Sequence, residues 1–302
     1  MKKSSQNISS YYATAASVGA ILLWCWSGIC FRFGSQLLGS MPYLALSCIV
    51  GVLAIVFLRF ISGGTVAGLF KIPFRLMVAG FFGVAVYTVI LVIAIGIADE
   101  MDIGQIMLIN YLWPIWMVLL GLFFLNEKPK VLLAIAGVLI GFTGVIIAGG
   151  FETFTRAPSS LVPHLLSLIG AFLWALYCVL QKHWKIPEEQ AGSTFHFAMC
   201  AILSAIITTT NRQWSSISNM NLSSFFWILF LGIGPIGLGY YWWEIGIKRG
   251  AVHLAAILAY FIPIGSTLLV ALFFRKALTI GLLPGAALIT AGAYVGKRAI
   301  KA

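Results

Sequence analysis

Two prolines interrupt long apolar stretches of the chain at matching places, and the residues beside them are the strongest candidates for binding chemistry. Pro114 and Pro263 each lie near the middle of a predicted membrane span. A proline inside a helix removes one hydrogen bond and frees the carbonyl four residues earlier, here those of Asn110 and Ala259. A free carbonyl at that depth is tolerated only where protein, water or a ligand satisfies it. The pair therefore predicts a small-molecule site at midplane depth, with kinks packed by neighbouring helices as the alternative.

Polar and aromatic side chains accompany these prolines. Asn110 adds an amide with donor and acceptor groups, and Tyr111 and Tyr260 add hydroxyls three residues before each proline. Aromatic residues away from the predicted interfaces suit the apolar part of a ligand, although packing between helices explains them equally well. The predicted substrate-binding residues are Trp24, Tyr87, Asn110, Tyr111, Trp113, Trp174, Tyr177 and Tyr260.

The sequence lacks the residue patterns of the common enzyme classes. It contains no convincing Ser-His-acid set, no metal-ligand spacing and no phosphate-binding loop. Its five cysteines lie within apolar runs, where we expect them to be buried side chains. We therefore expect no enzyme activity, no catalytic residue, no metal and no cofactor. A receptor or a structural membrane protein would not need the paired prolines.

Acidic residues are expected only near the ends of the predicted spans, so no carboxylate marks a proton relay at midplane depth. Glu244 is the deepest of them, and we expect it to pair with Lys248 one turn later. His196 and His253 can titrate near neutral pH, but packed or capping roles are commoner. Proton coupling and facilitated diffusion therefore both stay open.

The composition is that of a membrane protein. Hydrophobic residues make up 61 % and charged residues 9 % of the chain, against roughly 45–50 % and about 25 % in soluble domains. The apolar runs are continuous rather than alternating, which favours helices over barrel strands. Short loops indicate that no soluble domain is appended. The ten predicted spans are 11–31, 41–61, 74–97, 103–125, 130–149, 162–182, 192–210, 224–246, 252–274 and 278–296.

The second half of the chain repeats the first. The segment ending at Trp24 aligns with the segment ending at Trp174, at an offset of 150 residues, and later matches keep the same order. Five spans in each half mean that the second copy crosses the membrane in the opposite sense. We therefore predict an all-α integral membrane protein with two inverted five-helix repeats, 1–150 and 151–302, around a central cavity. This architecture is typical of alternating-access transporters.

Glycines flank equivalent loops in the two repeats. Gly96 and Gly104 flank the loop between the third and fourth helices, and Gly246 and Gly250 flank the loop between the eighth and ninth. Their inverted placement predicts hinges for one gate on each face of the membrane.

Basic residues gather in alternate loops and at both termini, whereas the other loops contain few. Because positive residues stay in the cytoplasm, both termini are predicted to be cytoplasmic. The net charge of +11 then reflects topology and contact with anionic lipid, not with nucleic acid. Small-molecule substrate and membrane lipid are the expected partners. The sequence leaves the oligomeric state open, and a monomer is consistent with it.

At this point the motifs resemble a known family. Pro114, Glu127, Gly137 and Gly144 match the pattern of the drug/metabolite transporter superfamily, and Pro263, Gly285 and Gly292 repeat it, but Lys276 replaces the second glutamate. Within the superfamily, residues 109–114 and 169–178 are similar to the YddG-type aromatic amino-acid exporters.

The resemblance implies export of aromatic and other neutral amino acids across a bacterial inner membrane. It also implies that the first, third, fourth, sixth, eighth and ninth helices enclose the cavity, with the fifth and tenth outside it. The alternative within the superfamily is an efflux pump for lipophilic drugs or other small metabolites. A cationic-drug pump should have a buried carboxylate at midplane depth, and the sequence predicts none.

Overall fold

The computed structural model describes residues 2–63, 65, 71–125, 130–150, 157–187, 192–275 and 280–299, and these residues form helices and no strands. The first half contains α1 (Lys2–Trp24), α2 (Ser27–Leu38), α3 (Ser40–Ile61), α5 (Phe74–Gly80), the π-helix η1 (Phe81–Val86), α6 (Tyr87–Ile97), α7 (Ile103–Asn110), α8 (Trp113–Phe124) and α9 (Val131–Gly149). The second half contains α11 (Leu161–His183), α12 (Ser193–Thr210), the 3₁₀ helix η3 (Gln213–Asn219), α13 (Leu222–Leu231), the π-helix η4 (Gly232–Gly239), α14 (Tyr240–Arg249), α15 (Val252–Leu258), α16 (Phe261–Phe274) and α17 (Leu282–Ala299).

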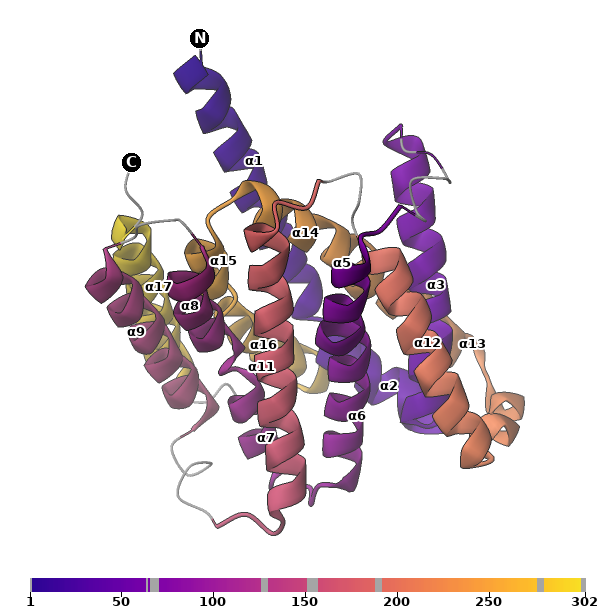
Figure 1. The fold of residues 1–302 in the computed structure, drawn as a ribbon. Coiled ribbons are helices and arrows are strands. Elements are labelled where there is room, and N and C mark those ends of the chain that lie inside the picture. The colour runs from indigo at the N-terminus through magenta and orange to yellow at the C-terminus, as the bar shows by residue number, and fades with distance from the viewer. Residues whose placement is uncertain are drawn as a thin grey trace.

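Nine helical segments of the described residues are long and apolar enough to cross a membrane. They coincide with the first nine predicted spans, so the chain is a multi-pass membrane protein. The tenth predicted span falls on α17, which is not one of the nine and carries Lys297 and Arg298 in its last turn. In Figure 1, α1 begins and α17 ends on the same side of the bundle, which we call the terminal side.

Several spans consist of two helices joined at a break. The α7–α8 span breaks at Tyr111 and Leu112, and the α15–α16 span breaks at Ala259 and Tyr260. Each half also contains a π-helical segment, η1 in the third span and η4 in the eighth. Such segments commonly mark functional sites in helices. Equivalent spans of the two halves therefore carry the same kinds of irregularity.

The two predicted midspan prolines begin new helices rather than kinking continuous ones. Pro114 and Pro263 lie in the first turns of α8 and α16, where a missing N–H costs no helical hydrogen bond. The predicted free carbonyl at Ala259 is wrong, because this carbonyl accepts a hydrogen bond from the Ile262 N–H at 3.0 Å. At the break, the Ala259 carbonyl accepts from the N–H three residues later instead of the N–H four residues later, which Pro263 lacks.

Helices α9 and α17 pack side by side along glycines (Figure 1). A Cβ atom at Gly144 would lie 2.6 Å from the Gly285 carbonyl, and one at Gly285 would lie 2.6 Å from the Gly144 carbonyl. Gly137 and Gly292 are related in the same reciprocal way, at 2.9 and 2.6 Å. These four glycines therefore let two helix backbones touch, which gives the spaced glycines of the sequence pattern a structural reason.

Candidate substrate-binding site

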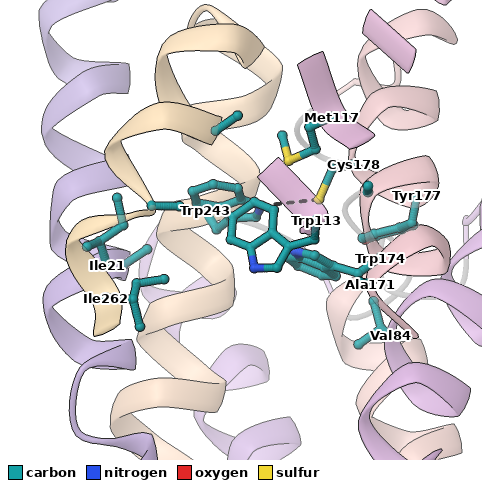
Figure 2. Close-up of a cluster of buried hydrophobic side chains, with 14 of the residues drawn as sticks. Ile21, Val84, Trp113, Met117, Ala171, Trp174, Tyr177, Cys178, Trp243 and Ile262 are labelled. Atoms are coloured by element: carbon teal, nitrogen blue, oxygen red, sulfur yellow. Dashed lines mark hydrogen bonds between the residues drawn. The ribbon is translucent and has the colours of Figure 1, made fainter. Parts of the chain in front are cut away.

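Aromatic side chains gather around Trp174 of α11 in the middle of the bundle. The ring centroid of Trp174 lies 5.3–6.4 Å from those of six neighbours, arranged edge-to-face, tilted or stacked. These geometries are the favourable ones for aromatic pairs. Figure 2 shows Trp113, Trp174 and Trp243 meeting from three different helices. We call the group the tryptophan cluster; it comprises Trp24, Tyr87, Trp113, Trp174, Tyr177, Tyr240 and Trp243.

The cluster contains residues from both halves of the chain. Helices α1, α6 and α8 supply three of its members, and α11 and α14 supply the other four. Five of the eight predicted site residues are therefore brought together here. Tyr240 and Trp243 were missed by the sequence reasoning. They belong to an unbroken aromatic run, residues 240–243, and such a run does not reveal which side of a helix faces inward.

Two indole N–H groups of the cluster are occupied by protein acceptors. The Trp24 Nε1–H donates to the Pro235 carbonyl in η4 at 3.0 Å, and the Trp243 Nε1–H donates to Cys178 Sγ at 3.4 Å (Figure 2). The first hydrogen bond joins the two halves of the chain, and the second joins α14 to α11 within the second half. Trp24 and Trp243 consequently present ring surface rather than hydrogen-bonding groups to anything bound beside them.

Asn110 supplies an open polar group next to this apolar surface. It is the last residue of α7, just before the helix break, and is 5 % exposed. Its side chain interacts with the Tyr87 hydroxyl. Its Oδ1 atom has no hydrogen-bond partner in the part of the chain that the structure describes. Because a buried acceptor without a partner is costly, Oδ1 is suited to accept an N–H from a bound molecule.

The two predicted tyrosines at the breaks lie in different surroundings. Tyr111 is half-buried and lies near Tyr87 and Cys25, so it faces the centre of the bundle. Tyr260 is fully buried, and its ring lies 6.2 Å from that of Phe142 on α9 and covers Gly141. Tyr260 is thus not among the residues that gather around Trp174.

Glu244 forms a different ion pair from the predicted one. It is 3 % exposed on α14, and its Oε2 lies 3.8 Å from Arg59 Nη2 of α3. Its Oε1 accepts hydrogen bonds from the Ser193 N–H at 3.1 Å and from the Tyr177 hydroxyl at 3.5 Å. The pairing with Lys248 was wrong, because Glu244 points into the bundle whereas Lys248 reaches the Pro187 carbonyl at 3.3 Å.

His196 extends this polar group across α12. Its Nδ1 lies 3.2 Å from the Tyr177 hydroxyl and its Nε2 lies 3.1 Å from the Leu76 carbonyl of α5. Gly80 and Gly192 leave room for the ring. The expected packed role of His196 is thus confirmed. We call Arg59, Tyr177, Ser193, His196 and Glu244 the polar network; it ties α3, α5, α11, α12 and α14 together.

The four predicted hinge glycines fall into two environments. Gly96 and Gly104 are exposed, and a Cβ at Gly96 would meet no atom within 4 Å. A Cβ at Gly246 would instead meet Ser17 and Ala13 of α1. Gly250 has a Cβ position 3.3 Å from Ala13. On the terminal side, then, these glycines allow close helix packing.

Two residues of the predicted family pattern, Glu127 and Lys276, lie outside the described residues. In the described part of the chain, no group of three or more His, Cys, Asp or Glu residues is arranged to hold a metal ion.

Comparison with known proteins finds a family match in the second half of the chain and relatives along most of its length. Residues 161–296 match the EamA-like transporter family. A protein of Ancylobacter novellus called aromatic amino acid exporter YddG is 28 % identical, over 94 % of this chain and 96 % of that protein. The protein of that name from Salmonella typhimurium is 26 % identical, over 95 % and 97 %. The one from Escherichia coli is 26 % identical, over 74 % and 78 %.

A solved crystal structure is also similar, with a TM-score of 0.79 and 27 % sequence identity over 94 % of this chain and 96 % of the other. The resemblance inferred from the motifs is thereby confirmed, since the EamA-like family lies within the drug/metabolite transporter superfamily. Residues 161–296 thus match a domain of the EamA-like transporter family, a family of transporters and not of enzymes, and the chain is homologous over most of its length to the proteins named aromatic amino acid exporter YddG.

Proposed function

We propose that this protein exports amino acids, both aromatic and other neutral ones, across a bacterial inner membrane by alternating access. The observation that carries the proposal is the open Oδ1 acceptor of Asn110 beside the tryptophan cluster. The names of the homologues support the same substrate class. A zwitterionic amino acid needs neutral hydrogen-bonding groups together with apolar surface, and the residues supply this combination.

Seven of the eight predicted site residues have a role in this proposal. The ammonium group of the substrate donates to Asn110 Oδ1, with the hydroxyls of Tyr87 and Tyr111 beside it. The rings of the cluster hold the apolar side chain. Tyr260 has the weakest support among the predicted residues, because its ring packs against α9. The apolar part of the site is formed by Trp24, Trp113, Trp174 and Tyr177.

The proposed architecture is ten membrane helices in two inverted repeats, 1–150 and 151–302, with α17 as the tenth span. The helix breaks before Pro114 and Pro263 support it, as do the matching π-helical segments η1 and η4. The reciprocal glycine contacts between α9 and α17 add further support, because they relate the last helix of one repeat to the last helix of the other.

In the proposed orientation the terminal side is cytoplasmic, because most basic residues lie in the loops and tails of that side. The polar network would then hold the cytoplasmic side closed. Opening there would separate Glu244 from its partners, with bending at Gly246 and Gly250. Bending at Gly96 and Gly104 would open the opposite side.

Counterflow in liposomes that contain the purified protein tests the proposal. We expect uptake of labelled phenylalanine, tryptophan or threonine, no uptake of a lipophilic cation, and loss of amino-acid uptake in Asn110→Ala. Cation exchange without an amino-acid signal would instead identify an efflux pump for lipophilic drugs. The burial of Glu244 does not favour that alternative, since Arg59 already neutralises the carboxylate.

A further inference from the structure

A groove on the outer surface of the bundle shares only Tyr177 with the proposed transport site. It has a volume of about 460 Å³ and lies between α5 with η1 on one side and α11 on the other. Its lining is almost entirely apolar. The lining residues are Phe74, Arg75, Val78, Ala79, Phe82, Leu173, Leu176, Tyr177, Leu180 and Trp184.

The shape of the groove follows from one close helix contact. A Cβ at Gly83 would lie 2.8 Å from the Leu173 carbonyl, so η1 and α11 nearly touch there. The groove lies between this contact and the terminal-side ends of α5 and α11. Phe74 and Phe82 are 78 % and 47 % exposed, which leaves its wall open to the membrane. Phe82 lies eight positions after Phe74, which corresponds to about 12 Å along a helix.

One positive charge stands at the mouth of the groove. The Arg75 guanidinium lies over the Trp184 ring, 5.2 Å from its centroid. This cation–π contact occupies a face of the guanidinium and leaves its N–H edges free for an anion. Within the described residues no carboxylate forms an ion pair with Arg75. In the sequence, Lys185 follows Trp184 directly and Lys71 precedes α5, but Arg75 is the charged residue among those that line the groove.

We propose that this groove binds an anionic phospholipid, with the phosphate on Arg75 and one acyl chain along the apolar lining. A cavity of this size is in the usual range for small-molecule sites. Basic pockets between membrane helices are suited to anionic headgroups. The apolar lining selects a lipid over free phosphate, because the phosphate ion alone would leave the groove unfilled.

Occupancy of the groove is expected to stabilise the polar network. Tyr177 forms part of the groove wall, and its hydroxyl contacts both His196 and Glu244. A chain packed against the Tyr177 ring would hold this side chain in place. The lipid is thus expected to raise the thermal stability of the protein.

Thermal unfolding in detergent, with added phosphatidylglycerol or phosphatidylcholine, tests the proposal. We expect phosphatidylglycerol to raise Tm more than phosphatidylcholine in the unmodified protein. Arg75→Gln should remove most of the difference between the two lipids in their effect on Tm, because it removes the side chain that binds the phosphate. Ala79→Phe should have the same result because it fills the groove. Arg249→Gln is the matched control, because Arg249 also lies over an aromatic ring, that of Tyr12 at 5.8 Å, but lines no part of this groove.

Lipid counts from native mass spectrometry provide a second readout if Ala79→Phe fails to fold. The proposal is overturned if Arg75→Gln keeps the full lipid effect, if Arg249→Gln loses as much as Arg75→Gln, or if inorganic phosphate alone reproduces the shift. These results do not depend on which substrate is transported, so they separate this proposal from the proposed function.

Discussion

The two helix breaks of the molecule share a backbone design but differ in chemistry. In the first half the break follows Asn110, whose buried amide keeps an open acceptor, and the next tyrosine faces the centre of the bundle. In the second half the break begins at Ala259, whose carbonyl is satisfied, and Tyr260 packs against α9. The comparison shows that equivalent spans can share a helix break while only one of the two breaks carries a buried amide with an open acceptor.

The largest expected effect concerns the ion pair that joins the two halves. Arg59→Gln leaves the carboxylate of Glu244 buried without its cation, which costs about 3–5 kcal/mol for a buried pair. We expect a strongly lowered Tm. The double variant Arg59→Gln with Glu244→Gln should recover much of that loss, since no buried charge is left unpaired. Strictly additive losses in this double-mutant cycle would show that the pair does not link the halves.

The second-largest expected effect concerns Asn110, which lies at the helix break of the first half. Asn110→Ala removes the open acceptor, and the loss of such a buried group costs about 1–3 kcal/mol, or roughly 5- to 150-fold in affinity. We expect weaker phenylalanine binding by that factor, measured by titration calorimetry. Asn126→Ala, at a position outside the described residues, is the control and should bind normally. Equal binding by the two variants would remove Asn110 from the site.

Variants of the predicted hinge glycines distinguish a role in helix packing from a role in helix bending. Gly246→Leu must push against Ser17 and Ala13, and overpacking of this kind typically costs about 1–3 kcal/mol. Gly96→Leu meets open space, so it should keep the Tm of the unmodified protein while slowing counterflow. Unchanged flux in Gly96→Leu would reject Gly96 as a hinge.

The smallest expected effect compares the two tyrosines. Tyr111→Phe should weaken substrate binding by the worth of one hydrogen bond, about 0.5–1.5 kcal/mol. Tyr260→Phe should leave binding unchanged, because its hydroxyl has no partner among the described residues and its ring contacts α9. A larger loss in Tyr260→Phe than in Tyr111→Phe would reverse the assignment of recognition to the first half.

Much of the fold could be predicted from the sequence because membrane helices depend on local composition. The first nine predicted spans coincide with helical segments, since roughly 20 apolar residues suffice to cross the hydrocarbon core. An irregularity near each proline was also foreseeable, because proline lacks an N–H wherever it occurs, but the sequence predicted kinks where the structure has breaks that precede the prolines. Trp24 and Trp174, which align in the sequence repeat, are two of the rings that meet, with their centroids 6.0 Å apart.

Other features depend on contacts between residues far apart in the sequence. Helical spacing allowed Glu244 to pair with Lys248, but the fold brings Arg59, 185 positions away, to the carboxylate. For the same reason the sequence did not predict Trp243 as a member of the cluster, since its neighbour Cys178 lies on another helix. Periodicity indicates which face of a helix is apolar, but it does not identify the helix that covers this face.

The sequence by itself determined the membrane class, the helical spans, an irregularity near each of the two prolines and the resemblance to a transporter superfamily. Each of these follows from local composition or from short motifs. Only the tertiary structure decided that Trp174 is the centre of the aromatic cluster, that Tyr260 turns toward α9, and that Glu244 pairs with Arg59. These outcomes depend on how the helices pack, because side chains equally suited to the interior are distinguished only by the neighbours they meet.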